Sequence, residues 1–212
     1  MAKLQMFLPK RIERTLFVLF LVGLFAACTP SNKPILPSSA EQPQSDTGES
    51  ITHPEFANWS QFNVGAKATR YRVVTNEYGE VRVTTTFFLE EKSDDHVTVR
   101  SQVDVERPDR PLEQNPPQST RFEAKFSLPR GLTEEFFKLP NAKAKLVGEE
   151  KMEVAGRQVE AEVYEWTESN EAGPMAIKLW RSNAVPGRII RQEMLIESSK
   201  TKTVEEMKEV AW

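Results

Sequence analysis

Three stretches of the chain, 81–90, 97–105 and 121–128, alternate between apolar and polar residues. The side chains that share one face are Val81, Val83, Thr85, Phe87 and Leu89 in the first stretch, Val97, Val99, Ser101, Val103 and Val105 in the second, and Phe122, Ala124, Phe126 and Leu128 in the third. A period of two is typical of a β-strand with one buried face. Three such strands in succession predict antiparallel neighbours with one solvated side.

Further strands are predicted at 70–75, 145–154, 158–167, 175–181 and 188–197. Ala155-Gly156 predicts a hairpin between two of them, and Pro186-Gly187 suits the central positions of a type II turn. The end of the chain, 203–212, is compatible with a last strand or with a short helix, because Thr201 to Val204 favours the first and Glu205 to Lys208 the second. The Pro-rich stretch 107–118 predicts a loop.

Two short helices are predicted. Residues 54–62 follow His53 and would bury Phe56, Trp59 and Phe62. Thr133 can cap a helix over 134–138, which has acidic residues in its first turn and Pro140 beyond its end.

We therefore expect a mainly β (α+β) body, a curved antiparallel sheet or half-barrel of about eight strands with one or two short helices. A flat open sheet would leave its edges and one face unprotected, so such a sheet must curl. With this element order, and with Trp180 followed by Val185-Pro186-Gly187 before a strand, the body resembles the half-barrel domains of the lipoprotein carriers and of several bacterial lipoproteins. The resemblance is architectural and carries over no binding residue.

The first residues read as an export signal. Lys3, Lys10, Arg11 and Arg14 precede thirteen uncharged residues, 15–27. A helix of that length spans about 20 Å, less than the ~30 Å core of a bilayer, which favours a signal peptide over a membrane span.

Leu24-Phe25-Ala26-Ala27-Cys28 resembles the lipobox of bacterial lipoproteins, although that family prefers Leu where Phe25 stands. The resemblance implies that Cys28 receives a diacylglycerol, that the chain is cut before it, and that the new amine takes an acyl group such as palmitate. Two or three acyl chains give stable anchoring. The alternatives are a plain secretory signal, or an uncleaved anchor, with Cys28 incidental.

This interpretation divides the chain into a signal peptide (1–27), a Pro/Ser-rich disordered tether (28–50) and a β-rich globular domain (51–212). Without 1–27 the chain carries 24 Lys and Arg against 30 Asp and Glu, so attachment must come from lipid rather than from a basic surface. We expect a lipid anchor in the cell membrane or the outer membrane with the body exported. Thr29, where the retention signal of the family has Asp, leans toward the outer membrane.

Composition limits the chemistry. A single cysteine excludes a disulfide scaffold and a multi-thiolate metal site, and a net charge of -3 gives no reason to expect nucleic acid as a partner. The common catalytic and nucleotide-binding motifs are absent from the sequence. We expect no enzyme, no catalytic residue, no metal and no cofactor. His96 after Ser93-Asp94-Asp95 is either a solvated turn or, less readily, a metal ligand or general base.

Seven apolar side chains could either form a plain core or line a cavity: Phe87, Phe122, Phe126, Phe136, Phe137, Met175 and Met194. Phe88 and Trp180 fall on the solvent faces of their strands, where they could contact a helix or a partner. Glu160, Glu162 and Glu165 could pair with Lys178 and Arg191 across strands.

The preferred hypothesis is a membrane-anchored exported lipoprotein whose β-rich domain binds an apolar ligand or lipid, or an envelope protein, with the ligand-binding residues unassigned. The alternative is a structural or assembly lipoprotein of the envelope that acts through protein contacts and has a solid core.

Overall fold

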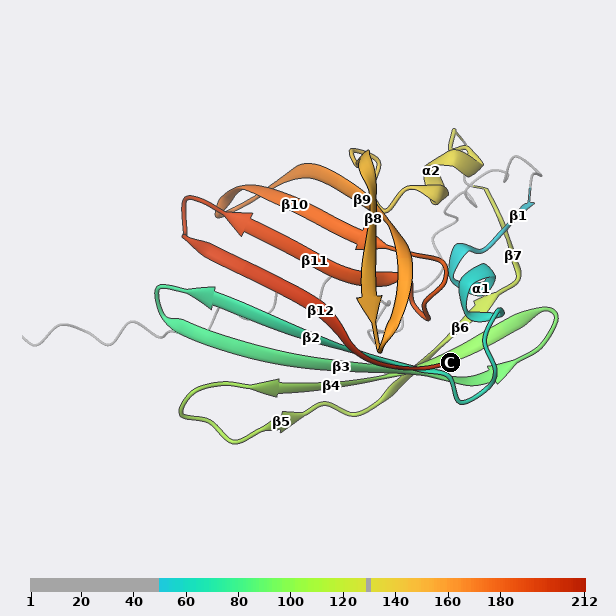
Figure 1. Ribbon diagram of the computed structural model, residues 1–212, viewed down its shortest axis with the longest axis horizontal. Coiled ribbons are helices and arrows are strands. Elements are labelled where there is room, and N and C mark those ends of the chain that lie inside the picture. Colours follow the sequence, from blue (N-terminus) through green and yellow to red (C-terminus); the bar gives the residue numbers. More distant parts are fainter. Residues whose placement is uncertain (1–49, 129–130) are drawn as a thin grey trace, which may run out of the picture. The chain divides into compact units, whose positions relative to one another are not determined.

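The computed structural model describes residues 50–128 and 131–212, which form a mainly β structure with two short helices (Figure 1). The strands are β1 (Ser50–Thr52), β2 (Lys67–Asn76), β3 (Gly79–Lys92), β4 (His96–Glu106), β5 (Glu113–Gln114), β6 (Gln118–Glu123), β7 (Lys125–Ser127), β8 (Lys145–Val154), β9 (Arg157–Asn170), β10 (Gly173–Arg181), β11 (Ile189–Ile196) and β12 (Thr201–Ala211). The helices are α1 (Pro54–Trp59) and α2 (Glu134–Lys138). The predicted signal peptide, Cys28 and the tether up to residue 49 lie outside the described residues, and Ser50 is already the first residue of β1.

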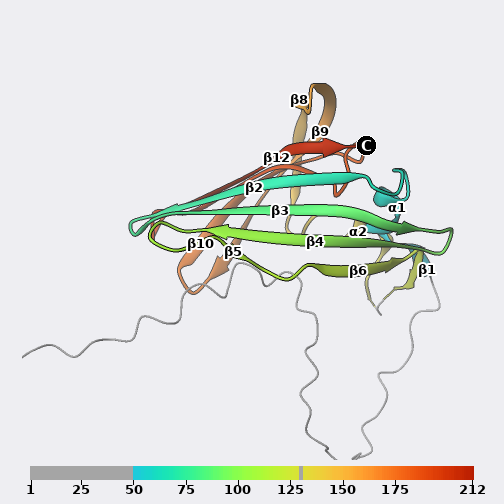
Figure 2. The same ribbon diagram turned by 90° about the horizontal axis from the view of Figure 1, so that it is seen from below.

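Ten of these strands form one curved antiparallel sheet that is not closed into a barrel, which confirms the predicted fold class. Its main order is β5-β4-β3-β2-β12-β11-β10-β9-β8, and β6 also pairs with β4. The sheet thus consists of two meanders, β2 to β4 and β8 to β12, joined where the first long strand pairs with the last. Figure 2 shows β12, β2, β3, β4 and β6 side by side.

The alternating pattern located the long strands. The predicted strand over 145–154 has the bounds of β8, and the end of the chain is the strand β12 rather than a helix. The predicted strand over 121–128 is divided, because β6 pairs with β4 whereas β7 pairs with β1 in a separate two-stranded sheet. The division falls at Ala124, whose N–H donates to the Asp95 carbonyl (2.6 Å) and whose carbonyl accepts from His53 N–H (3.0 Å).

The turns agree with their residues. Ala155 and Gly156 take φ of 50° and 78° between β8 and β9, as a tight two-residue hairpin requires. After Pro186, Gly187 has φ 73°, and the Arg188 N–H donates to the Val185 carbonyl (3.1 Å). That is the predicted type II turn.

Helix α1 has six residues and is too short to persist in isolation. His53 caps it, since its Nδ1 accepts from Glu55 N–H (3.1 Å), and Pro54 occupies the first turn. Asn58 ties the helix to the turn before β11: its Nδ2 donates to the Val185 carbonyl (3.0 Å) and its Oδ1 accepts from Gly187 N–H (2.7 Å).

Most of the buried apolar residues in the described part of the chain belong to three clusters. Under α1, Trp59 packs with Ala66, Leu89, Val97 and Val99. A second cluster gathers Val154, Val159, Ala161, Val163, Trp180, Val185 and Ile190, and a smaller one gathers Ala144, Tyr164 and Leu179. The α1 cluster defines which sheet face carries the helix, and we call it the helix-bearing face.

Candidate functional site

Strand β2 places two arginines on the helix-bearing face. Ala68 and Phe87 lie opposite each other in register next to the α1 cluster, and Arg70 and Arg72 follow Ala68 at every second position. Arg72 is opposite Val83 on β3 and opposite Glu205 on β12. Because β2 pairs with β12, the Glu205 carboxylate lies beside Arg70 and Arg72, which are about 130 positions earlier in the chain.

These three residues form a buried charged cluster. Glu205 is only 3% exposed. Its Oε2 accepts from Arg72 Nε (2.5 Å), and its Oε1 from Arg70 Nη1 (3.2 Å). The Arg70 guanidinium also lies over the Phe87 ring, 4.4 Å from its centroid. Burial lowers the pKa of Arg70, and the neighbouring Glu205 carboxylate counteracts that effect.

A second ion pair lies at the start of α1. Arg188, after the type II turn, contacts the Glu55 carboxylate. Glu55 also acts electrostatically on Arg70, so the two groups of charges belong together. Three arginines against two glutamates leave this end of the helix-bearing face with one excess positive charge. The neighbouring His53 stays predominantly neutral at pH 7, because burial lowers its pKa.

An aliphatic surface extends from the charged cluster. Val74, Val81, Val83, Val103 and Val105 lie on the helix-bearing face of β2, β3 and β4, and we call them the valine patch. All five are half-buried, and none belongs to the three apolar clusters of the described residues. The register continues the patch across the sheet from Val81 and Val74 through Thr203, Met194, Ile177 and Trp166. The residues of this band lie directly opposite one another on six successive strands.

Across β3 and β4 the other face of the sheet is mostly polar, with Arg82, Thr84, Thr86, Gln102 and Asp104. Across β9 and β10 it carries ion pairs as well as the buried cluster of Trp180 and Val163. Lys178 pairs with Glu165 across β10 and β9 (3.2 Å), as predicted. Arg191 instead pairs with Glu206 (2.7 Å) on that face. Glu162 pairs with Arg181 (3.2 Å), but this pair lies on the helix-bearing face, in register with Tyr164 and Leu179. Across β3 and β4 the contrast between the two faces makes the helix-bearing face, with its valine patch, the candidate surface for an apolar ligand.

The seven predicted cavity residues do not line one site. Phe87 and Phe122 pack into the α1 cluster. Phe126, Phe137 and Phe136 form an aromatic row that starts at His53, with ring centroids 4.9–5.4 Å apart. Met175 and Met194 lie on β10 and β11, and only Met194 belongs to the band described above. The valines, which alternation had assigned to a buried face, are the more informative set.

Phe88 and Trp180 were both predicted on solvent faces. Phe88 is half-buried, with the Arg100 guanidinium 4.9 Å from its ring centroid. Trp180 shares its face with Lys178 and Arg191 but is buried, so its prediction as an exposed contact is wrong. It packs on Val163, and its Nε1 donates to the Glu150 carboxylate (2.8 Å), because the β8–β9 hairpin covers it.

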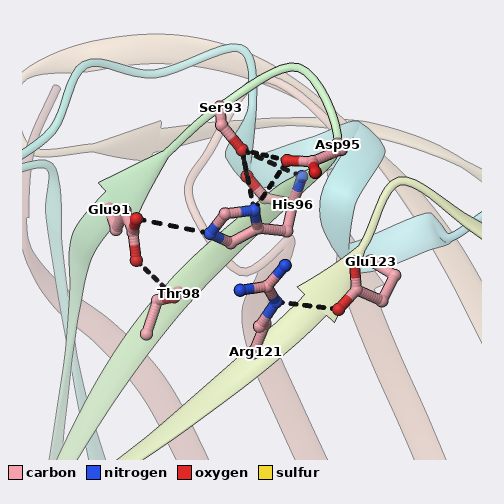
Figure 3. A network of polar contacts seen from close by, with 7 residues as sticks. All are labelled: Glu91, Ser93, Asp95, His96, Thr98, Arg121 and Glu123. Atoms are coloured by element: carbon pink, nitrogen blue, oxygen red, sulfur yellow. Dashed lines mark hydrogen bonds and ion pairs between the residues drawn. The ribbon is translucent and has the colours of Figure 1, made fainter.

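His96 lies in a polar network at the turn between β3 and β4 (Figure 3). The Asp95 carboxylate and the Ser93 hydroxyl both contact the same ring nitrogen, Nδ1, at 2.7 and 2.8 Å. The other nitrogen, Nε2, is 3.4 Å from the Glu91 carboxylate. The Ser93 hydroxyl also accepts from His96 N–H (3.2 Å), as in a turn held by its own side chain.

This arrangement differs from a nucleophile–base–acid relay. In such a relay one ring nitrogen faces the hydroxyl and the other faces the carboxylate. Here serine and aspartate share one nitrogen, and the serine hydroxyl donates to Asp95 (2.5 Å). Two carboxylates do surround His96, but the geometry is that of a braced turn.

The His96 network should titrate. Hydrogen bonding to Asp95 raises the pKa of His96, and bonds from Ser93 and then His96 lower the pKa of Asp95 to about 2. The protonated histidine therefore stabilises the fold fully below pH ~6.5, and this contribution is lost as pH rises through the raised pKa. The Asp95 contribution is present above pH ~4 and is lost as pH falls towards 2.

An NMR titration of the His96 ring checks this, with D95N as the variant. We expect a midpoint above 6.5 in the unmodified chain and a lower one in D95N. A midpoint that D95N leaves unchanged would assign the shift to something other than the Asp95 contact.

A hollow of about 450 Å³ lies beside the β8–β9 hairpin and the turn after β10. It is lined by Glu149, Gln158, Val159, Glu160, Ala161, Glu162, Ser182, Asn183 and Ala184.

Among the described residues, no group of three or more His, Cys, Asp or Glu side chains is placed to hold a metal ion. No helix in the same part of the chain is long and apolar enough to cross a membrane.

Comparison with known proteins gives structural likenesses only. No protein-family model matches the chain, and no curated protein matches it. A solved structure described as having a YmcC-like fold, from Bacteroides fragilis, is 9% identical, covers 71% of this chain and 97% of its own, and has a TM-score of 0.39.

Two further structures have lower scores. A DUF1329 family protein from Desulfovibrio piger is 8% identical, covers 74% of this chain and 90% of its own, and has a TM-score of 0.27. A domain from Vibrio parahaemolyticus described as belonging to an outer membrane lipoprotein-sorting protein is 9% identical, covers 69% and 84%, and has a TM-score of 0.25. At these scores the likenesses assign neither a family nor an activity to the chain.

Proposed function

We propose that this chain is an exported lipoprotein, anchored through Cys28, whose β-rich domain binds an apolar ligand with an acyl-like chain on the helix-bearing face and performs no catalysis. The valine patch carries the proposal. Five half-buried valines lie on one sheet face outside the apolar clusters, next to a cluster with one excess positive charge. Burying such side chains against a ligand removes apolar surface from water, at about 25 cal/mol per Å².

A photoreactive ligand tests the binding surface. A palmitate analogue that carries a diazirine, irradiated with the full chain, should cross-link to peptides of β2, β3 and β4. V83N places an amide in the patch and should reduce cross-linking about tenfold, because the amide must lose water without gaining a partner. The matched control is V73N, since Val73 is half-buried on the opposite face of β2.

Equal cross-linking of V83N and V73N would contradict the proposed surface. Cross-linking spread evenly over the domain would favour the alternative, an envelope assembly protein with a solid core. Circular dichroism of both variants establishes that each remains folded.

The anchor is tested separately. In a bacterial host that processes lipoproteins, the mature chain should begin at Cys28 and carry the mass of a diacylglycerol and an acyl group. C28S should remain unacylated. A mature chain that begins elsewhere, or that has the mass of the bare polypeptide, would remove the anchor from the proposal while leaving the valine patch to be judged by cross-linking.

A further inference from the structure

Large apolar side chains are exposed in one short segment between α2 and the start of β8. Phe136, Leu139, Leu146 and Val147 are 40%, 37%, 54% and 52% exposed. They account for half of the large apolar side chains that the described residues expose. Exposed apolar side chains scattered singly need no explanation, whereas four of them within twelve residues call for one.

The segment is fixed rather than loose. The Arg181 guanidinium donates to the Lys138 carbonyl. Asn141 Nδ2 donates to the Glu168 carboxylate (2.7 Å), and Asn141 accepts from Ala144 N–H through its carbonyl (3.0 Å). Ala144 is buried against Tyr164 and Leu179. These contacts hold the backbone on the sheet while the aliphatic side chains face solvent.

The segment is positively charged, whereas the chain without residues 1–27 is acidic as a whole. Residues 138–148 contain Lys138, Lys143 and Lys145 and no acidic residue, and all three lysines are exposed. Glu134 and Glu135 precede the segment, with Glu134 paired to Lys138 (3.2 Å), and Glu149 and Glu150 follow it. Without residues 1–27 the chain as a whole is acidic, with 24 Lys and Arg against 30 Asp and Glu. A bilayer with anionic lipid would therefore attract this surface and repel most others.

We propose that these four apolar residues and three lysines, the α2–β8 patch, contact an anionic lipid bilayer. The apolar side chains enter the headgroup region, and the lysines lie at the level of the lipid phosphates. The inference rests on the proposed anchor at Cys28 only in that the anchor keeps the domain at a bilayer. It is independent of the ligand proposed for the valine patch.

A fluorescent label at Leu146 tests the contact. The anchored thiol of Cys28 would be blocked, so L146C supplies the free thiol of the chain. The full chain, labelled with NBD, is reconstituted into vesicles of phosphatidylcholine with and without phosphatidylglycerol. We expect a blue-shifted emission that doxyl lipids quench, in the vesicles that contain phosphatidylglycerol. L195C is the matched control, because Leu195 is 40% exposed on β11, away from the patch.

The lysine contribution is tested by K138Q/K143Q/K145Q in the L146C chain. Each lysine near an anionic surface contributes about fivefold to the equilibrium constant between the embedded and the free patch. Removing all three should therefore lower that constant about 100-fold. The control K92Q/K200Q/K202Q removes three exposed lysines elsewhere and should leave that equilibrium unchanged. Aqueous emission from L146C, or equal embedding of L146C and L195C, would overturn the contact. Equal embedding on phosphatidylcholine alone would overturn its dependence on anionic lipid.

Discussion

Replacing Glu205 with glutamine should lower the free energy of unfolding by about 3–5 kcal/mol. The Glu205 side chain is 4% exposed and neutralises Arg70 and Arg72, whose side chains are 12% and 26% exposed. Without the carboxylate, two guanidinium groups remain close together and largely out of water. Burial already lowers the pKa of Arg70, and among the groups that oppose this shift the Glu205 carboxylate has the largest effect. Urea denaturation followed by tryptophan fluorescence measures the loss.

Glu206 is the matched control for this variant. It is the next residue of β12, its side chain is 32% exposed, and it pairs with Arg191 and Lys208. E206Q should cost at most about 1 kcal/mol, because solvent screens these pairs. The triple variant R70M/R72M/E205L removes all three charges and should recover most of the loss. A triple variant as unstable as E205Q would show that the hydrogen bonds, rather than the charge balance, matter.

Replacing Trp59 with alanine should lower the free energy of unfolding by about 3–5 kcal/mol, an effect as large as that expected for E205Q. Trp59 is 2% exposed, and its neighbours Leu89, Val97 and Val99 are all nearly inaccessible. The indole is also the buried apolar side chain through which the six-residue helix α1 joins the core, with the partly buried Phe56 beside it. The variant should therefore release α1 as well as reduce stability.

Hydrogen exchange separates the two effects. In W59A the amides of residues 56–60 should exchange at the rate of an opened segment, while those of β3 and β10 follow the global unfolding free energy. Y78A is the control for the loss of an aromatic side chain, because Tyr78 is 84% exposed and its removal should change stability by about 0.5 kcal/mol or less. A W59A chain that keeps its α1 amides protected would show that the Asn58 contacts alone retain the helix.

The sequence predicted the strands better than the site. Alternation is set by the backbone, so it placed Val81, Val83, Val103 and Val105 on one face, and the turn residues Ala155-Gly156 marked where β8 ends. It could not show that α1 covers only one end of that face and leaves those valines outside the core. That depends on where a six-residue helix packs, and its position is fixed by Trp59 and by contacts with the distant residues Val185 and Gly187.

The charged cluster was not foreseen, although a signal for it exists. Arg70 and Arg72 lie between Ala68 and Val74 on the same face of β2, so two charged residues occupy positions where the pattern would have apolar ones. Their partner, Glu205, lies in the stretch whose composition was compatible with either a strand or a helix. Only the pairing of β12 with β2 makes the three residues neighbours. The buried position of Trp180 was missed because alternation within β10 does not show that the preceding β8–β9 hairpin covers it, with Glu150 of β8 accepting from the indole.

The junction between β2 and β12 also governs the order of events along the chain. About 130 residues separate the strands that it joins, and the two meanders share one sheet only through that pairing. We expect such a distant contact to form after the pairings between neighbouring strands within each meander. Until that pairing forms, β2 has β3 as its one sheet neighbour, and the two meanders are separate sheets that each expose an unpaired edge strand.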